Sequence, residues 1–137
     1  MMTVGKQEKG QNLVEFALIL PVFLLLVVGM AEFGRAWMTK NILTGAAREA
    51  VRAAAVDWKA NACDNAKTIA DPILDSWDIP LLVCATDITI SPPAAPVPIV
   101  SVTTRHTLSP IITGFLPPPL DVPFKLTGTA TMRRERD

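Results

Sequence analysis

The chain has 137 residues, half of them hydrophobic and 19% charged, and its 13 Lys and Arg balance its 13 Asp and Glu. This length accommodates one domain rather than two. The apolar content excludes a disordered chain, which would need far less apolar residue and more net charge. The zero net charge argues against a nucleic-acid partner, since nucleic-acid-binding proteins usually carry a basic excess.

An uncharged apolar run from Phe16 to Ala31, bounded by Glu15 and Glu32, is the strongest single feature. The two apolar residues before Glu15 lengthen the run to positions 13–31. An α-helix rises 1.5 Å per residue and needs about 20 apolar residues to cross a bilayer core. Residues 11–31 are therefore predicted to form a transmembrane helix segment.

The helix is predicted to continue beyond the apolar run. At residues 32–56, apolar positions keep the three- and four-residue spacing of one face of an amphipathic helix. No proline or turn cluster separates this stripe from the run, so a single helix is expected over about residues 12–56. Pro21 lacks a backbone donor and should bend it. The glycines of this helix, among them Gly29 and Gly34, are either tolerated or leave flat patches that another helix can approach closely.

The same apolar run has a second interpretation, as the hydrophobic region of a cleaved secretory signal. Lys6 and Lys9 would supply its basic flank, and Gly29 and Ala31 place small residues where signal peptidase prefers them. Cleavage after Ala31 would release a secreted binding module. The helical stripe that continues without a break argues against it. The Lys and Arg counts on the two flanks do not choose an orientation.

Residues 57–137 are expected to form a small domain of a different kind. A short helix is predicted at about residues 65–77, with a break at Pro80. Eleven of the 12 prolines lie between Pro72 and Pro123. The stretches SPPAAPVP and LPPPLDVP cannot join a sheet interior, so they are expected to be loops or edge segments.

Three short strands are expected in this second half. Apolar and polar residues alternate at residues 86–90 and 99–104, and a third candidate covers residues 124–132. The predicted fold is α+β: one long N-terminal helix, transmembrane and then amphipathic, packed by a small C-terminal domain with a few antiparallel strands. The order of the strands stays open.

Cys63 and Cys84 are the only cysteines. If this half is exported, a disulfide is expected between them, closing a loop of about twenty residues and worth roughly 3 kcal/mol in the chain-entropy model. In the cytosol they would be two buried free thiols. Two cysteines and one His without close spacing make a poor ligand set, so no metal site is predicted.

Residues for catalysis are scarce. His106 is expected to be solvated or hydrogen-bonded as a structural residue, and the sequence contains no Gly-rich phosphate loop, nucleophile elbow or paired carboxylates. No catalytic residue, cofactor or small-molecule substrate is predicted. A third possibility is a single-pass anchored enzyme or sensor. Such a protein would need a polar site, and the sequence does not show one.

Glu15 is a carboxylate within the apolar run, where burial costs a few kcal/mol. Either it lies near the headgroups or it has a partner. The stretch GQNLVE, which begins at Gly10, resembles the type IV prepilin processing site, in which a peptidase cuts after a glycine and a glutamate is fifth in the mature chain. Cleavage between Gly10 and Gln11 would make residues 1–10 a leader. In a pilus, Glu15 could then neutralise the Gln11 amine of a neighbouring subunit.

A longer stretch is similar to the N-terminal region of TadE-like proteins, minor pseudopilins of the Tad (tight adherence, Flp pilus) system. The features that carry the similarity are Val14-Glu15-Phe16-Ala17-Leu18, Pro21, Glu32-Phe33-Gly34-Arg35 and Ala46-Ala47-Arg48-Glu49, with an echo at Thr129–Glu135. The similarity implies a structural membrane protein for assembly of an adhesive pilus, not an enzyme. Its helix would pack against other pilin helices through Phe16, Pro21, Gly29, Glu32, Phe33, Gly34, Arg35, Ala47 and Arg48.

The same resemblance implies partners and a location. The partners would be a prepilin peptidase, the inner-membrane pilus assembly platform with its ATPase, other pilins or minor pseudopilins, and the lipid bilayer. The protein would cross the inner (cytoplasmic) membrane once, with its N-terminus in the cytoplasm. Residues 57–137 would be periplasmic or extracellular, and incorporation into a pilus is a further expectation.

Overall fold

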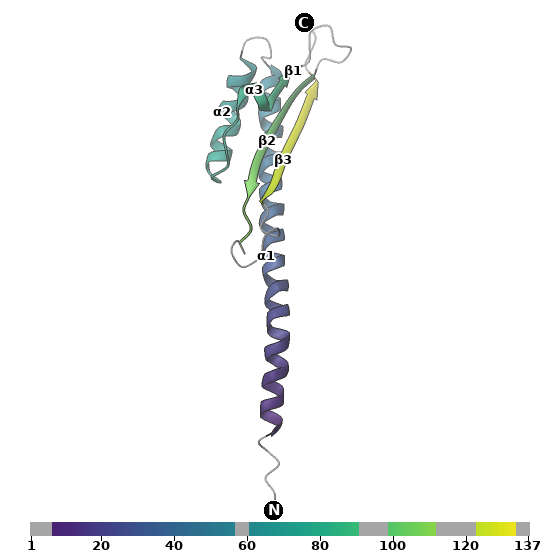
Figure 1. Cartoon of the computed structure of the whole chain (residues 1–137). Helices are drawn as coiled ribbons and strands as arrows, with labels where there is room; N and C mark the ends of the chain where they lie inside the picture. The colour runs from purple at the N-terminus through teal and green to yellow at the C-terminus, as the bar shows by residue number, and fades with distance from the viewer. Residues whose placement is uncertain (1–6, 57–60, 91–98, 112–122, 134–137) are drawn as a thin grey trace, which may run out of the picture. The chain divides into compact units, whose positions relative to one another are not determined.

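The computed structural model describes residues 7–56, 61–90, 99–111 and 123–133 (Figure 1). The elements, in chain order, are helices α1 (Gln7–Val56), α2 (Ala62–Asp75) and α3 (Cys84–Asp87), and strands β1 (Ile88–Ile90), β2 (Ile99–Leu108) and β3 (Phe124–Arg133). The chain divides into two compact units, Met1–Arg35 and Ala36–Asp137, so α1 contributes to both. The predicted α+β class, with a long apolar N-terminal helix and three antiparallel strands, is confirmed.

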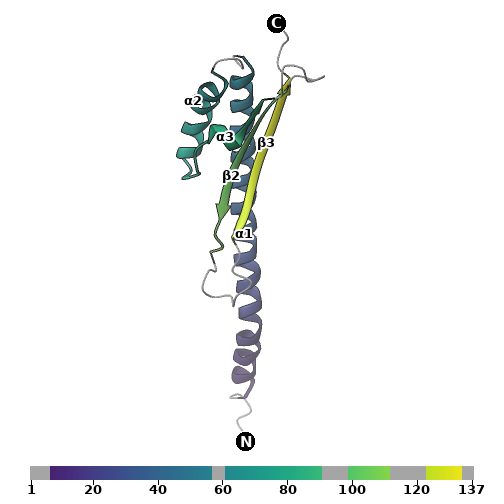
Figure 2. The ribbon, with the colours of Figure 1, turned by 45° about the horizontal axis from the view of Figure 1, so that its top comes forward.

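The second unit contains an antiparallel sheet in the order β1-β2-β3. β2 and β3 pair along their whole length, from Ile99 opposite Arg133 to Leu108 opposite Phe124. β1 is short and pairs its three residues with the start of β2. In both views β2 and β3 lie along the C-terminal part of α1, and α2 lies beside the same part of the helix (Figures 1 and 2).

The core of this unit is built from small and branched aliphatic side chains. On β2 the buried positions alternate, with Val100, Val102 and Thr104 on one face and the polar Ser101 and Thr103 on the other. That period of two is the pattern of a strand with one covered face. The helices contribute buried residues at helical spacing, which are Leu43, Ala46, Ala47, Ala50, Val51 and Ala54 on α1 and Ala62, Ala66, Ala70 and Leu74 on α2.

The sheet approaches α1 most closely at Gly128. The Thr104 hydroxyl lies 2.9 Å from the carbonyl oxygen of Leu43, to which it donates, and 3.3 Å from that of Gly128. A Cβ added to Gly128 would lie 2.6 Å from both the Leu43 oxygen and the Thr44 nitrogen. The Lys40 ammonium also donates to the Thr127 carbonyl. Only a residue without a side chain fits between β3 and the helix backbone here.

The structure refines the predicted helices. The first begins at Gln7 rather than about residue 12, and it continues through Pro21 to Val56. The second covers Ala62–Asp75 instead of residues 65–77. Both differences lie at helix ends, where boundaries depend on capping and fraying.

The strand prediction needs one correction. Thr86 and Asp87 were expected in a strand over 86–90 but lie in α3, so β1 begins at Ile88. The Asp87 carboxylate accepts the Val83 backbone N–H at 2.8 Å, and this local bond favours a helical turn over the ladder. The second strand extends to Leu108 and the third to Arg133. Of the proline-rich loops, residues 91–98 and 116–122 lie outside the described residues.

Replacing Gly128 with alanine should weaken this unit. Because the added Cβ would meet helix backbone, the sheet has to move, and overpacking of this kind typically costs about 1–3 kcal/mol. Gly45→Ala is the matched control, since its added Cβ meets no atom within 4 Å on α1 and should stabilise the helix by up to about 1 kcal/mol. Chemical unfolding of the full chain in detergent measures both. Equal stability of Gly128→Ala and the unsubstituted chain would contradict the close approach.

Candidate functional site

The predicted processing site lies near the start of α1. Gly10 and Gln11 are helical and exposed, one turn after the helix begins at Gln7. They share one face of the helix with Glu15, around a shallow open hollow bordered by Gly10, Gln11, Val14, Glu15, Leu18 and Ile19. Helix ends fray readily, so this bond is more accessible to a peptidase than one deep within α1.

The helix around Glu15 is apolar on all sides. Most large side chains from Leu13 to Val27 are more than half exposed, with Leu18 at 74% and Leu25 at 72%. Soluble monomers rarely leave so large a contiguous apolar surface in water. By length and composition, α1 can cross a membrane. The surface is therefore suited to lipid or to other apolar helices.

The residues expected to pack against other helices fall into two groups. Phe16 and Phe33 are 61% and 68% exposed, and a Cβ added to Gly29 would meet no atom within 4 Å. These positions are accessible to a second helix, and so are Pro21 and Gly34. Glu32 and Arg35 form an ion pair at 3.5 Å, one helical turn apart.

The second group lies in the Ala36–Asp137 unit. Ala47 is fully buried in its core, so it packs within the chain rather than against a partner. Arg48, the next residue, is exposed. The helix-packing surface is therefore continuous only in the N-terminal part of α1, where no side chain from Gly10 to Val27 is buried.

Comparison with known families assigns the N-terminal region. Residues 10–52 match the family described as TadE-like protein. The N-terminal helix is TadE-like. The match confirms the resemblance found in the sequence, and it begins at Gly10, the glycine of the predicted processing site. The match covers residues 10–52 of 137, so it assigns this segment and not the whole chain.

The TadE-like match ends within α1, at residue 52. It therefore leaves α2, α3 and all three strands outside the matched segment. No curated protein and no solved structure matches the chain. What the second unit does must be argued from its own residues.

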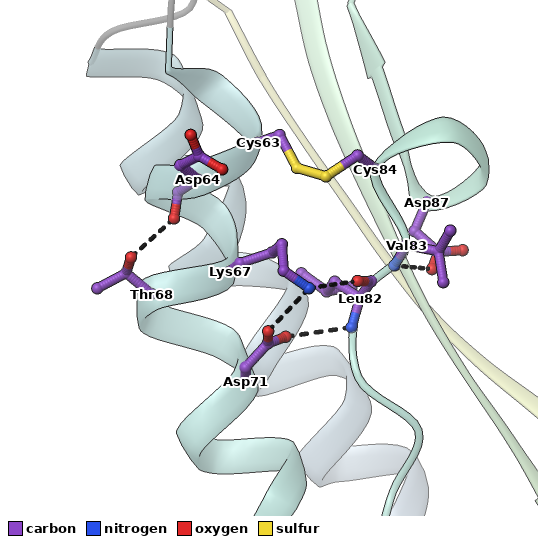
Figure 3. Close-up of a disulfide and its surroundings, with 9 residues drawn as sticks. All are labelled: Cys63, Asp64, Lys67, Thr68, Asp71, Leu82, Val83, Cys84 and Asp87. Atoms are coloured by element: carbon purple, nitrogen blue, oxygen red, sulfur yellow. Dashed lines mark hydrogen bonds and ion pairs between the residues drawn. A yellow bond between two sulfur atoms is a disulfide. The ribbon is translucent and has the colours of Figure 1, made fainter.

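A disulfide joins Cys63, in the first turn of α2, to Cys84 at the start of α3 (Figure 3). Their Cα atoms are 5.7 Å apart, a normal separation for a disulfide. It attaches α2 to the segment that leads into the sheet. In the described part of the chain no group of three or more His, Cys, Asp or Glu could hold a metal ion.

Two side chains of α2 also form hydrogen bonds with the segment that leads into the sheet, in addition to the disulfide (Figure 3). Asp71 accepts the Leu82 backbone N–H at 3.1 Å, and Lys67 donates to the Leu82 carbonyl at 2.8 Å. Lys67 and Asp71 are themselves an ion pair at 3.0 Å. One helical turn of α2 thus provides hydrogen-bond partners for both the N–H and the carbonyl of Leu82. The side chain of Leu82 is buried in the core.

Asp87 is a buried carboxylate that sequence reasoning missed. It accepts the Val83 backbone N–H and, at 2.8 Å, an Arg105 guanidinium N–H, which ties α3 to β2. Arg105 also donates to the Thr86 carbonyl. His106, predicted to be structural, is half-buried on β2, and its Nδ1 has no hydrogen-bond partner among the described residues. The acidic residue within TDITI was the available signal for Asp87, but the sequence does not reveal its partner on another strand.

Removing the disulfide should destabilise the second unit. Residues 63 and 84 are 21 apart in sequence, and a loop of this size is worth roughly 3 kcal/mol in the chain-entropy model. The double variant Cys63→Ser, Cys84→Ser should lose about this free energy of unfolding. Reductant should lower the stability of the unsubstituted chain and leave the double variant unchanged. A chain insensitive to reductant would contradict a structural disulfide.

The Asp71 contact gives a further prediction. In Asp71→Ala the Leu82 N–H loses its acceptor, and the free energy of unfolding should fall by about 1–2 kcal/mol. Asp75→Ala removes the same charge from the exposed side of α2 and should change it by less than about 0.5 kcal/mol. Chemical denaturation of both variants measures the difference. Equal losses of unfolding free energy in the two variants would contradict a specific role for the Asp71–Leu82 hydrogen bond. They would assign the effect to charge or helix propensity.

Proposed function

We propose that this protein is a minor pseudopilin, a structural membrane protein for assembly of an adhesive Tad (Flp) pilus. The observation that carries the proposal is the TadE-like match, which begins at Gly10 and includes Gln11 and Glu15 at the spacing of a prepilin processing site. The all-round apolar surface of α1 beyond Glu15 supports it, because a pilin needs a helix that is stable both in lipid and among other helices.

In this proposal a prepilin peptidase removes residues 1–10 and frees the amine of Gln11. The segment 11–31 then spans the membrane. The new amine and the Glu15 carboxylate are opposite charges at the edge of an apolar helix. Where several such helices associate, Glu15 of one subunit neutralises Gln11 of the next, so neither charge stays unpaired.

The disulfide supports one orientation. Disulfides persist in oxidising compartments such as the periplasm and are rare in the cytosol. The bond between Cys63 and Cys84 therefore favours a periplasmic or extracellular location for residues 57–137. The N-terminus would then lie in the cytoplasm, with a single pass through the inner membrane.

The partners in this proposal come from the TadE-like match. The start of α1 would be recognised by the prepilin peptidase, and the exposed apolar helix would contact the bilayer, other pilins or minor pseudopilins, and the inner-membrane assembly platform. Gly29 and Gly34 offer open positions for close approach of a second helix. Neither a nucleic acid nor a small-molecule substrate is part of this proposal.

The alternative is a secreted binding module cleaved by signal peptidase after Ala31. The structure offers it less support, since α1 is helical without interruption through Ala31 and on to Val56. A peptidase acting there would have to unwind the middle of a helix. At Gly10 it would open only an end.

The mature N-terminus distinguishes the two routes. Intact mass and terminal peptide mapping of membranes from a host with its prepilin peptidase should give a chain that begins at Gln11. Gly10→Val should leave the chain at full length, because a branched side chain replaces the residue before the scissile bond. Ala31→Phe is the matched control, since it blocks signal peptidase and should not alter the Gln11 terminus.

A chain that begins at Glu32, and that Ala31→Phe restores to greater length, would overturn the proposal in favour of a secreted module. An uncut chain in a host with active peptidase would also overturn it and leave a permanently anchored protein. Cleavage at Gln11 that persists when the peptidase is deleted would assign the cut to another enzyme.

A further inference from the structure

The disulfide between Cys63 and Cys84 has two unlike ends. Cys84 is exposed to solvent, whereas Cys63 is half-buried. Cys63 is the second residue of α2, a helix of 14 residues, and Cys84 is the first residue of α3, which has four. An external thiolate that opens the bond attacks one sulfur and releases the other, so the two ends compete.

The surroundings of Cys63 favour the release of its sulfur as a thiolate. The first backbone N–H groups of a helix have no partner within the helix, and together with the macrodipole they stabilise a nearby negative charge. Lys67 follows Cys63 by four residues, so both lie on one face of α2, and both point toward residues 82–84 (Figure 3). The Asp71 carboxylate, which pairs with Lys67, lies a further turn from Cys63. Asp64 is exposed, where water and salt screen its charge.

We propose that Cys84 is the site of thiol–disulfide exchange on this protein, and that Cys63 is the internal thiol that closes the bond again. In the opening step, an external thiolate attacks Sγ of Cys84. The bond between the two protein sulfurs breaks, and its electron pair leaves on Sγ of Cys63. The products are a mixed disulfide on Cys84 and a thiolate on Cys63. One thiolate is consumed and one is released, so the step needs no further reactant.

The same path in reverse forms the bond. The Cys84 thiolate attacks an external disulfide, that of glutathione or of a thiol oxidoreductase, and one external sulfur leaves as a thiolate. Cys63 then attacks Sγ of Cys84 and releases the second external sulfur. The two protein thiols lose two electrons and two protons, and the external disulfide becomes two thiols. External disulfides persist in oxidising compartments, so this direction rests on the exported location of residues 57–137 in the proposed function.

Hydrogen bonds keep the two cysteines together while the bond is open. Asp71 and Lys67 bind the backbone of Leu82, two residues before Cys84, at 3.1 and 2.8 Å. These contacts involve no sulfur, and the Leu82 side chain is buried in the core, so the segment stays beside α2 after the bond opens. A thiolate held close to its target reacts at a high effective concentration. Lys67 and Asp71 are therefore positioning residues for closure of the bond.

Trapping with glutathione tests which sulfur is attacked. The full chain, purified in detergent with its disulfide intact, is incubated with reduced glutathione, and N-ethylmaleimide then blocks every free thiol. Cys63 and Cys84 are the only cysteines, so peptide mapping by mass spectrometry locates both adducts without ambiguity. We expect glutathione on Cys84 and maleimide on Cys63. The helix terminus alone should favour this arrangement over the reverse by about two- to fivefold, and the greater exposure of Cys84 should add to the ratio.

The positioning role has its own pair of variants. Asp71→Ala should raise the fraction of chains trapped as the mixed disulfide, because Cys63 is held less firmly beside Cys84. Asp75→Ala removes the same charge from the exposed side of α2 and should leave that fraction unchanged. In both variants glutathione should stay on Cys84. Equal trapping in the two variants would overturn the positioning role of Asp71.

Other results would overturn the exchange site itself. Glutathione mainly on Cys63, or divided evenly between the two cysteines, would overturn the assignment of Cys84. A bond that exchanges only in denaturant would overturn exchange in the folded protein. These failures leave the proposed function standing if the mature chain begins at Gln11. A mature chain that begins at Glu32 would overturn the proposed function and leave the exchange site intact, because both cysteines remain in it.

Discussion

The contact between the backbone of β3 and the backbone of α1 at Gly128 and Leu43 is the constraint on which the second unit depends. The Thr104 hydroxyl bridges the helix carbonyl and the strand carbonyl at this point, so helix, central strand and edge strand meet around one side chain. Given this contact, the register of β2 and β3 fixes which residues face the helix. A shift by one residue would place polar residues in the core.

The two parts of α1 meet different surroundings because their sequences differ in pattern. In the first part apolar residues cover every side, and nothing from Gly10 to Val27 is buried within the chain. From Leu43 onward only one face is apolar, and it is covered by the sheet and α2. The stretch from Glu32 to Met38 lies between the part of α1 that is apolar on every side and the part that is apolar on one face. It carries an ion pair and exposed aromatic rings. A single helix thus changes from a lipid-compatible surface to half of a protein core.

Local patterns were sufficient to predict most of the fold and the TadE-like character of the N-terminal segment. The helix, the later strands and the Gly10–Glu15 spacing are all periodic or short-range features, and the TadE-like resemblance depends on the same segment. Non-local contacts were not predictable. Asp87 lies with Thr86 in α3 and accepts a hydrogen bond from Arg105 on β2. Asp71 accepts the backbone N–H of Leu82, eleven residues later in the chain. Position 128 needs a glycine because the backbone of Leu43 lies so close to it. The sequence does not show that these two residues are neighbours in the fold.

The order of the elements along the chain also constrains when the second unit can form. Lys40 and Thr127, which meet where the sheet crosses the helix, are 87 residues apart. During synthesis the apolar face of α1 from Leu43 to Ala54 is made early, and the strand that completes its cover is made late. Until then this face lacks part of its cover, because long-range pairings form slowly and leave apolar surface exposed. The core of the second unit is therefore complete only when the last of its three strands, Phe124–Arg133, has been made.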